Sequence, residues 1–222
     1  MESPPRRRAG APRSFNRDHA VDIAMRLFRR RGYEGVSVAD LTAAIGIAPP
    51  SLYAAFGSKA GLYREALDRY AALPGALDGM AGAQTPAQAA RELLRAAVRA
   101  ATSGEKGCMI STGLVEGAVE QQELARELAA RRRDLRDRIA GVLERWLPPE
   151  DAARRAAFLL AVQQGISVQA RDGESADRLM LIAETAVAAM EAEDRRPRAT
   201  PRSGGRDPGS ADEGDGADLP AS

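Results

Sequence analysis

Apolar residues recur at spacings of three and four along most of the chain, and no run of β-branched residues alternates with polar ones. On a helix, such spacings place apolar side chains on one face, where they can be buried together. The first such segment runs from about Arg17 to Arg31 and carries its stripe on Val21, Ala24 and Phe28. The pattern predicts an all-α protein of about nine helices.

The two ends of the chain differ in composition from its middle. Residues 1–16 hold four arginines among prolines and a glycine, and residues 194–222 are rich in Pro, Gly, Ser and Asp. Such compositions cannot form a packed core, so we expect both ends to be disordered. Between them, a glycine-rich break at 74–85 separates a first unit, 17–73, from a second helical unit, 86–193. The helices expected in the second unit are 86–102, 105–117, 121–147, 149–171 and 175–193.

Composition argues against several classes of protein. The single cysteine, Cys108, and the single histidine, His19, cannot build a disulfide framework or a structural zinc site within one chain. No nucleophile with an adjacent base, phosphate-binding glycine loop or cofactor fingerprint stands out, so we expect no enzyme, cofactor or metal. Apolar runs are too short to span a membrane, and the first residues lack the apolar core of a secretion signal. We therefore expect a soluble, cytoplasmic protein without a membrane partner.

Positive charge is concentrated at the front of the chain. The first 70 residues contain twelve Arg or Lys against seven Asp or Glu, although the whole chain has a net charge of only +1. A basic face is where a polyanion binds. This asymmetry is consistent with a nucleic-acid partner.

Residues 37–56 fit two short helices joined by a tight turn. Ser37 opens the sequence SVAD, which places Asp40 at the last position of a capping-box-like arrangement. Gly46 ends that helix, and Pro50 can start the next because proline costs nothing in the first turn. Helix, glycine turn and helix in this order are typical of a helix-turn-helix DNA-binding motif.

The second helix of this motif has two different faces. Leu52 and Phe56 are four residues apart and would face the core, while Ser51, Tyr53 and Ala54 would face outward. An outer face of small residues and one long hydroxyl suits the approach to bases and phosphates. Alternatively, Tyr53 is half-buried packing, because a generic three-helix corner also needs a glycine at its turn.

Lys59 lies in the first turn of the next helix, which Ser58 can cap. Its ammonium and the nearby backbone N–H groups would then meet the same DNA phosphate. The alternative is an ordinary solvated lysine. The two readings differ in whether removing Lys59 weakens DNA binding.

Three motifs stand in order between Asn16 and Tyr70: LF…RGYEGVSV, IA…G(I)…SLY and FGSK…L. At these spacings the block resembles the N-terminal domain of the TetR/AcrR family of bacterial transcriptional regulators. The resemblance implies a helix-turn-helix domain that binds double-stranded operator DNA, followed by a helical domain for effector binding and dimerisation. The stretch QQGISVQARDG near the C-terminus is similar to a subgroup of the same family.

The resemblance also implies roles for individual residues. Ser37 would cap the bracing helix toward a phosphate, and Lys59 would take the place of the family's phosphate-binding lysine. Many members have Tyr-His where this sequence has Ala54 and Ala55, which leaves less side chain for base readout. The expected DNA-binding residues are Ser37, Thr42, Pro50, Ser51, Tyr53, Ala54 and Lys59.

Two late segments, near 158–168 and 179–190, are apolar almost all the way round. A helix of that kind has more than one partner, and helix-turn-helix proteins commonly bind palindromic sites as dimers. We expect a homodimer, although both helices would look the same as central helices of a monomer. The expected interface residues are Phe158, Val162, Ile166, Leu179, Ile182 and Val187.

The stretch KGCMISTGLVEGA combines small residues with a methionine, a composition that can line an apolar cavity. We expect an unknown small-molecule effector there, although plain core packing explains each residue equally well. The expected ligand-binding residues are Cys108, Met109, Thr112, Leu135 and Phe158.

These features predict a TetR-type regulator, a repressor that binds a palindromic operator as a dimer and is released by a small molecule. One alternative is the same DNA-binding fold without a small-molecule gate. Another is a redox or electrophile sensor at Cys108, where Lys106 would favour the reactive thiolate. Residues two apart on a helix do not face each other, however, and a lone cysteine on an apolar helix is usually inert.

Overall fold

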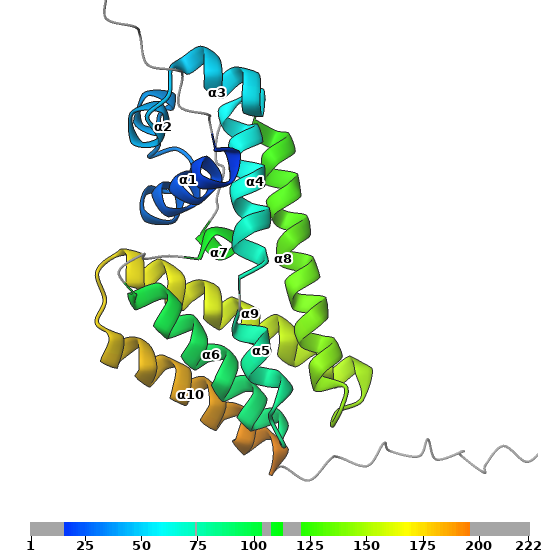
Figure 1. The fold of residues 1–222 in the computed structure, drawn as a ribbon. Helices are drawn as coiled ribbons and strands as arrows, with labels where there is room; N and C mark the ends of the chain where they lie inside the picture. Colours follow the sequence, from blue (N-terminus) through cyan, green and yellow to red (C-terminus); the bar gives the residue numbers. More distant parts are fainter. Residues whose placement is uncertain (1–15, 74, 104–107, 113–120, 196–222) are drawn as a thin grey trace, which may run out of the picture.

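The computed structural model describes residues 16–73, 75–103, 108–112 and 121–195. Every regular element in these ranges is a helix, which confirms the predicted all-α class (Figure 1). The first unit contains α1 (Arg17–Arg31), α2 (Val38–Ile45), α3 (Pro49–Phe56) and α4 (Lys59–Ala71). The second contains α5 (Ala76–Ala81), α6 (Pro86–Thr102), α7 (Met109–Thr112), α8 (Gln122–Leu143), α9 (Pro149–Arg171) and α10 (Ala176–Asp194).

The expected glycine-rich break contains a short helix, α5, that the sequence pattern does not predict. The carboxylate of Asp78 accepts a hydrogen bond from the Gly75 N–H (2.7 Å), which caps the helix at its first turn. Met80 and Ala83 are buried in the same core cluster as α6. Packing against α6 therefore stabilises this helix, which is too short to be stable on its own.

An aromatic cluster fills the core of the first unit. The ring of Tyr63 packs edge-on against Phe28 at 4.8 Å and against Tyr33 at 5.0 Å between centroids. Burial raises the pKa of Tyr63 to about 12, so its hydroxyl stays neutral. Residues far along the chain complete this core: Met109, Leu124 and Leu128. Segments of the second unit therefore complete the core of the first unit.

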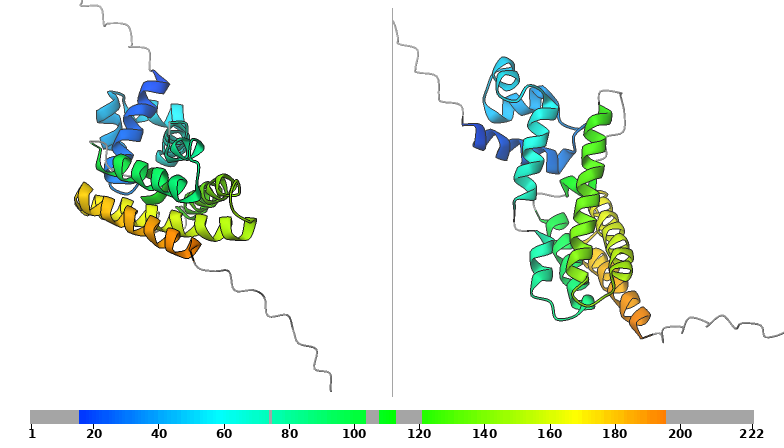
Figure 2. Two further views of the ribbon diagram at one scale, coloured as in Figure 1. Left: turned by 90° about the horizontal axis from the view of Figure 1, so that it is seen from below. Right: turned by 90° about the vertical axis from the view of Figure 1, so that its right-hand side faces the viewer.

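The second unit has its own core of leucines and alanines from α5, α6, α8, α9 and α10. α9 and α10 lie side by side along one edge of this unit (Figure 2). α8 runs from the level of α4 down to the lower end of the molecule, so it spans both units (Figure 1).

Ion pairs join α4 to α8 at the boundary between the units. The Arg64 guanidinium donates to both carboxylate oxygens of Glu127 at 2.7–3.0 Å. One turn further along, Arg131 pairs with Asp68. A partly exposed polar joint of this kind contributes less stability than an apolar one and is more easily rearranged.

Candidate nucleic-acid interface and ligand cavity

A complete capping box begins α2. The Asp40 N–H donates to the Ser37 hydroxyl oxygen (3.0 Å), and the Ser37 N–H donates to the Asp40 carboxylate (2.9 Å). Hydrogen bonds from Ser37 and from the Arg31 guanidinium lower the pKa of Asp40 to about 2. The expected cap is thus present, and it fixes the N-terminus of α2 at the molecular surface.

Gly46 forms the turn between α2 and α3. Its φ of 78° lies in the left-handed region that favours glycine, and its N–H closes α2 on the Thr42 carbonyl (2.9 Å). α3 then begins at Pro49, one residue earlier than expected, with two prolines in its first turn. The axes of α2 and α3 bend by 97°, which is the corner of a helix-turn-helix.

The two faces of α3 separate as the spacing predicts. Leu52 and Phe56 are buried, at 0% and 7% exposure, while the Tyr53 side chain is 50% exposed. Pro50, Ser51 and Ala54 lie on the same open face as Tyr53. A row of small side chains with one phenol therefore stands free of the core.

Thr42 requires a correction. Its side chain is only 6% exposed, and its hydroxyl donates to the carbonyls of Val38 (3.0 Å) and Ala39 (3.1 Å) within α2. A threonine that faces inward satisfies its hydroxyl on its own helix. The structure therefore does not present this side chain to a groove.

The start of α4 is held close to the end of α3. The Gly61 N–H donates to the Ser58 hydroxyl oxygen (3.0 Å), and a Cβ at Gly61 would lie 2.0 Å from the Phe56 carbonyl oxygen. Only glycine permits this approach. The ammonium of Lys59 lies 4.1 Å from the centre of the Tyr33 ring, and partial burial lowers its pKa.

Arg17, at the start of α1, contacts the C-terminal end of α3. The sequence pattern does not reveal this contact. The Arg17 guanidinium donates to the Ala55 carbonyl, pairs with the Glu65 carboxylate and lies 4.7 Å above the Phe56 ring. The start of α1 is thereby tied to both α3 and α4. Such a clamp joins residues 38 and 48 positions apart, so no local spacing indicates it.

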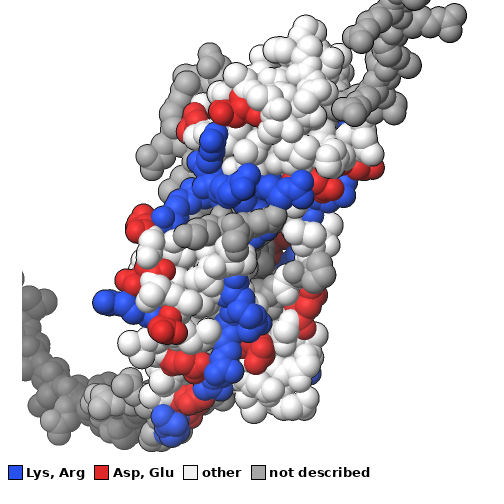
Figure 3. Space-filling view, turned by 60° about the vertical axis from the view of Figure 1, so that its left-hand side comes forward, with Lys and Arg blue, Asp and Glu red and all other residues white. Residues whose placement is uncertain are grey.

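The charge of the surface is unevenly distributed. Figure 3 shows basic side chains gathered in a band across the middle of one face, while the end that carries α2 and α3 is mostly uncharged. Small uncharged side chains suit base edges, and flanking arginines suit the phosphate backbone.

A cavity of about 810 Å³ lies at the boundary between the two units. Cys108 and Leu135, two of the residues expected to bind a ligand, line it, and so do Arg29 of α1 and Tyr70 of α4. Burial and the hydrogen-bonded Cys108 thiol raise the pKa of Tyr70. The volume falls within the usual range for small-molecule sites.

Two of the expected ligand-binding residues lie elsewhere. Met109 is buried in the aromatic core of the first unit and does not line the cavity. Phe158 is 41% exposed on the outer side of α9, because its helical face points away from the cavity. Thr112 ends α7, and its side chain lies outside the described part.

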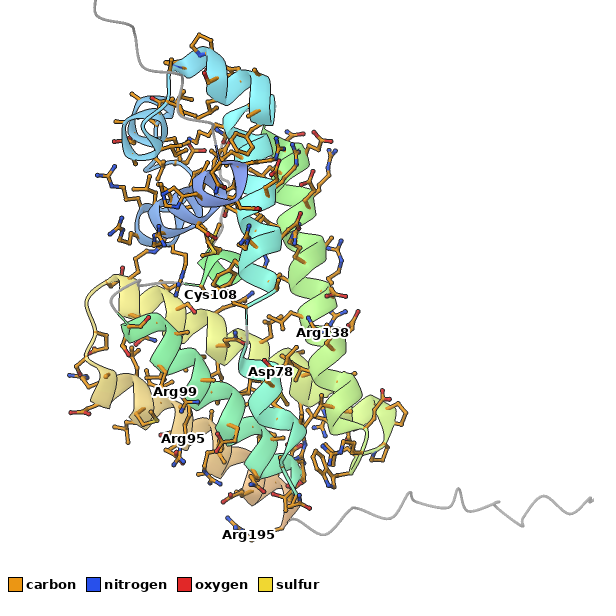
Figure 4. The ribbon with its side chains drawn as sticks, viewed as in Figure 1. Asp78, Arg95, Arg99, Cys108, Arg138 and Arg195 are labelled. Carbon is orange, nitrogen blue, oxygen red and sulfur yellow. The ribbon has the colours of Figure 1, made fainter. Side chains whose placement is uncertain are left out.

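Besides Tyr70 and Cys108, the polar residues of the cavity wall come from five helices: Arg29, Asp78, Arg99, Arg131, Asp134, Arg138, Gln163 and Ser167. They are spread over the sequence from Arg29 to Ser167, so local spacing gives no signal that they share a wall. Figure 4 labels Asp78, Arg99, Cys108 and Arg138, which come from different segments around this boundary.

Comparison with known proteins decides the family. The model for bacterial regulatory proteins of the tetR family matches residues 20–66. The HTH-type transcriptional repressor ComR of Escherichia coli (strain K12) is 35% identical over 196 residues, which cover 80% of this chain and 90% of ComR. The chain belongs to the TetR family.

Two further TetR-family proteins are similar along most of their length. The HTH-type transcriptional repressor BdcR of Escherichia coli (strain K12) is 35% identical over 191 residues, 82% of this chain and 92% of BdcR. A cysteine variant of the TetR family transcriptional regulator CifR, solved in complex with 26-bp double-stranded operator DNA, is 38% identical with a TM-score of 0.74. That alignment covers 81% of this chain and 99% of CifR. The TetR-family protein described here is thus a DNA-binding transcriptional regulator and not an enzyme.

The expected dimer interface of this TetR-family protein needs revision. Ile166, Leu179 and Val187 are completely buried in the core of the single chain, at 0% exposure, so they have no surface for a partner. Val162 and Ile182 are partly buried against the same core. Among the expected interface residues in the described part, Phe158 is the one that is largely exposed.

An apolar surface does exist on the outer side of α9 and α10. Phe158 (41%), Val168 (43%) and Leu181 (67%) are its large exposed side chains, and Ala161 lies between the two α9 residues. Spacings of three and seven place Phe158, Ala161 and Val168 along one face of α9. We call these four residues the outer apolar face.

Two other properties of the described residues bear on function. No group of three or more His, Cys, Asp or Glu lies together in them as a metal ion would require. No single described helix has the length and apolar content of a membrane span, and the bent pair α2 and α3 passes that test only when counted together.

Proposed function

We propose that this TetR-family regulator is a repressor that binds a palindromic operator as a homodimer and releases it when a small molecule enters the cavity. The observation that carries the proposal is that the cavity wall includes α1 and α4. α4 packs on α3, the proposed recognition helix, and Arg17 of α1 donates a hydrogen bond to α3. A ligand there would touch the support of the DNA-reading surface directly.

The DNA-reading surface that we propose consists of six residues. α3 supplies most of them, while the capped start of α2 and the start of α4 would bind the flanking phosphates. Thr42 is left out because it is buried. The proposed DNA-binding residues are Ser37, Pro50, Ser51, Tyr53, Ala54 and Lys59.

A homodimer follows from what one recognition helix can read. A single α3 spans too few base pairs for selectivity, so two copies on adjacent major grooves are needed. The outer apolar face supports the proposal, because large apolar side chains exposed on two adjoining helices mark an interaction surface. A two-fold axis there would pack α9 and α10 of both copies together.

Gating would act through α4. Its C-terminal residue pair, Tyr70 and Ala71, lines the cavity, and its first residue, Lys59, belongs to the proposed DNA surface. Arg29 lies 5.4 Å from the Tyr70 ring centre and links α1 to the same wall. A ligand that favours a different tilt of α4 would change the spacing of the two recognition helices and lower operator affinity.

The test begins with selection of bound fragments from genomic DNA with purified protein, followed by footprinting of the operator. Tyr53→Phe and Lys59→Ala should both weaken operator binding, and the lysine change should reduce the salt slope by about 1. Arg178→Ala, at the exposed start of α10, is the matched charge-removal control. Unchanged affinity and salt slope in both variants would refute this DNA surface.

Dimerisation has its own test. Leu181→Glu and Phe158→Glu should convert the dimer to a monomer in analytical ultracentrifugation, because each buries a charge in the proposed interface. Ala130→Glu, at an exposed position of α8, is the control. A dimer that survives both changes would place the interface elsewhere.

Thiol sensing is a second candidate, favoured by the position of Cys108 in the cavity wall beside Tyr70. An electrophile that alkylates the thiol would occupy the space of a ligand. Cys108→Ser should then abolish release of the operator by a maleimide. Release that persists in the serine variant eliminates this candidate.

A further inference from the structure

We propose that the effector is an organic anion with an apolar body, whose carboxylate is bound by Arg99 and Arg138 and whose hydrogen-bond donor meets Gln163. The inference rests on the proposed function, because it names the chemical class that the proposed effector cavity would take. Three observations support it: the charge of the wall, two arginines without an ion pair among the described residues, and a buried amide oxygen.

The wall of the cavity has a surplus of positive charge. Its charged residues are four arginines and two aspartates: Arg29, Arg99, Arg131, Arg138, Asp78 and Asp134. Two of the arginines are engaged within the protein, since Arg131 pairs with Asp68 and Arg29 lies against the Tyr70 ring. Arg99 and Arg138, both exposed at the wall, are the other two guanidinium groups that a bound anion can reach.

The arginines of α6 show that Arg99 is a special case. Arg91 and Arg95 both pair with Glu184 of α10, at 3.1 and 2.8 Å. Arg99 is one turn further on, lines the cavity and forms no ion pair with any described residue. A guanidinium offers a planar fork of donors that matches a carboxylate. The same helix thus uses two arginines for structure and presents a third to the cavity.

Arg138 approaches the cavity from α8. It forms no ion pair within the described ranges, even with Asp134, which lies one turn before it and lines the same cavity. The four arginines of the wall still outnumber its two aspartates, Asp78 and Asp134. Charge complementarity therefore favours an anion over a cation in this cavity.

Gln163 defines the other polar end of the ligand. This α9 side chain is 6% exposed, lines the cavity, and its Oε1 has no hydrogen-bond partner among the described residues. The nearby Ser167 hydroxyl does not serve, because it donates to the Gln163 backbone carbonyl (2.9 Å). A buried amide oxygen needs a donor, which a hydroxyl or N–H of the ligand would supply.

The rest of the wall requires an apolar body. Leu73, Leu77, Ala97, Ala100 and Leu135 contribute to it, and about 810 Å³ leaves room for a chain or ring system beyond the polar groups. The complete ligand is thus amphipathic, with an acidic end and a hydroxyl or N–H group.

The test uses four probes of one chain length: decanoate, omega-hydroxydecanoate, decanol and decylamine. Titration calorimetry on the purified full-length protein should show that both carboxylates bind, the hydroxylated one more tightly. Decanol and decylamine should bind with an affinity lower by about ten-fold or more than that of decanoate. Arg99→Gln and Arg138→Gln should each lower carboxylate affinity by about ten-fold and leave decanol unchanged. Arg95→Gln, one turn from Arg99 but outside the cavity, should have no effect.

Gln163→Leu gives an independent readout. The folded variant should bind decanoate normally and lose the advantage of the hydroxylated probe. If decanol or decylamine binds as tightly as decanoate, or if neither carboxylate binds the folded protein, the anion assignment is wrong. Fluorescence anisotropy of labelled operator DNA separates the two proposals. A carboxylate that binds the protein but leaves the operator complex intact refutes gating and leaves the proposed ligand class standing. Release of the operator by decanol or decylamine, but by neither carboxylate, supports gating and refutes the organic-anion class.

Discussion

The DNA-reading unit and the cavity region hold their polar groups in opposite ways. In the reading unit, the caps at Ser37 and Ser58 and the Arg17 clamp all meet partners within the chain. On α9, by contrast, Gln163 Oε1 and Arg155 Nε are buried without a hydrogen-bond partner among the described residues. Polar groups that are fully hydrogen-bonded within the chain hold one geometry, whereas a buried polar atom without a partner can still accept or donate a hydrogen bond to a bound molecule.

The difference suggests a division of labour. A recognition surface must be rigid before DNA arrives, so its backbone is specified locally and completely. A sensing region must respond, and the two unpaired atoms on α9 lie at the two places where we propose external contacts, although the other two Arg155 guanidinium nitrogens donate to Asp194. Gln163 faces the effector cavity, and Arg155 lies in a hollow beside Phe158 of the outer apolar face. Four experiments, taken in decreasing order of expected effect, test this division of labour.

Leu128→Ala tests whether the reading unit is self-contained. Leu128 belongs to α8, yet it is completely buried in the core cluster of the first unit. We expect a loss of about 2–5 kcal/mol in the free energy of unfolding, together with weaker operator binding. Chemical denaturation and operator titration measure both. If the variant is less stable, but its folded form binds the operator with unchanged affinity, then α8 does not support the DNA-reading unit.

Gly61→Ala and Gly141→Ala compare one glycine from each region. A Cβ at Gly61 would lie 2.0 Å from the Phe56 carbonyl oxygen, whereas nothing lies within 4 Å of one at Gly141. The first change should cost roughly 1–3 kcal/mol and displace α3, and the second should stabilise α8 by about 0.5–1 kcal/mol. Thermal unfolding measures both. Equal effects of the same sign would contradict the close approach at Gly61.

The sequence predicts the reading unit well because its determinants are local. The Ser37 capping box, the turn at Gly46 and the two faces of α3 all follow from residues within one or two helical turns. Thr42 is the exception, because the pattern alone does not show that its hydroxyl bonds back to α2.

The cavity and the apolar surface are harder to predict because their determinants are distant in sequence. An apolar residue on α9 looks the same whether it faces the core, as Ile166 does, or solvent, as Phe158 does. The sequence places Cys108 and Leu135 in the expected ligand set, and both line the cavity. That Arg99 and Arg138 also line it without an ion pair among the described residues depends on three-dimensional packing. Whether Glu184 reaches Arg95 and not Arg99 is decided by how α10 crosses α6.

Ser37→Ala tests how much the reading surface depends on its local cap. The hydroxyl satisfies the Asp40 N–H, so its removal should destabilise the protein by about 1 kcal/mol. Operator affinity should fall further than stability explains, because the start of α2 belongs to the proposed DNA surface. Ser103→Ala, which removes a C-terminal hydroxyl of α6, is the matched control. An effect on stability alone would leave Ser37 a structural cap without a role in binding.

Glu127→Gln probes the polar joint between the two regions and should have the smallest effect. Hydrogen bonds from Arg64 lower the pKa of Glu127 below its ordinary value of 4.5. As the pH falls, the Glu127 carboxylate is therefore protonated in the unfolded chain before it is protonated in the folded protein. The contribution of the Arg64–Glu127 pair to the free energy of unfolding is complete above about pH 4.5 and is lost as the pH falls through the lowered pKa. Both side chains are about one-third exposed, which limits the contribution to about 0.2–1 kcal/mol at neutral pH.

In urea titrations at several pH values, Glu127→Gln should therefore be less stable than the unsubstituted protein at neutral pH, and the difference should shrink in acid. Glu123→Gln is the matched control, because Glu123 is 79% exposed and lies 3.4 Å from the same guanidinium. A constant stability difference from neutral to acidic pH would show that Glu127 acts by packing and not through its charge. A difference that disappears in acid would establish a joint held by charge, unlike the apolar cores on either side of it.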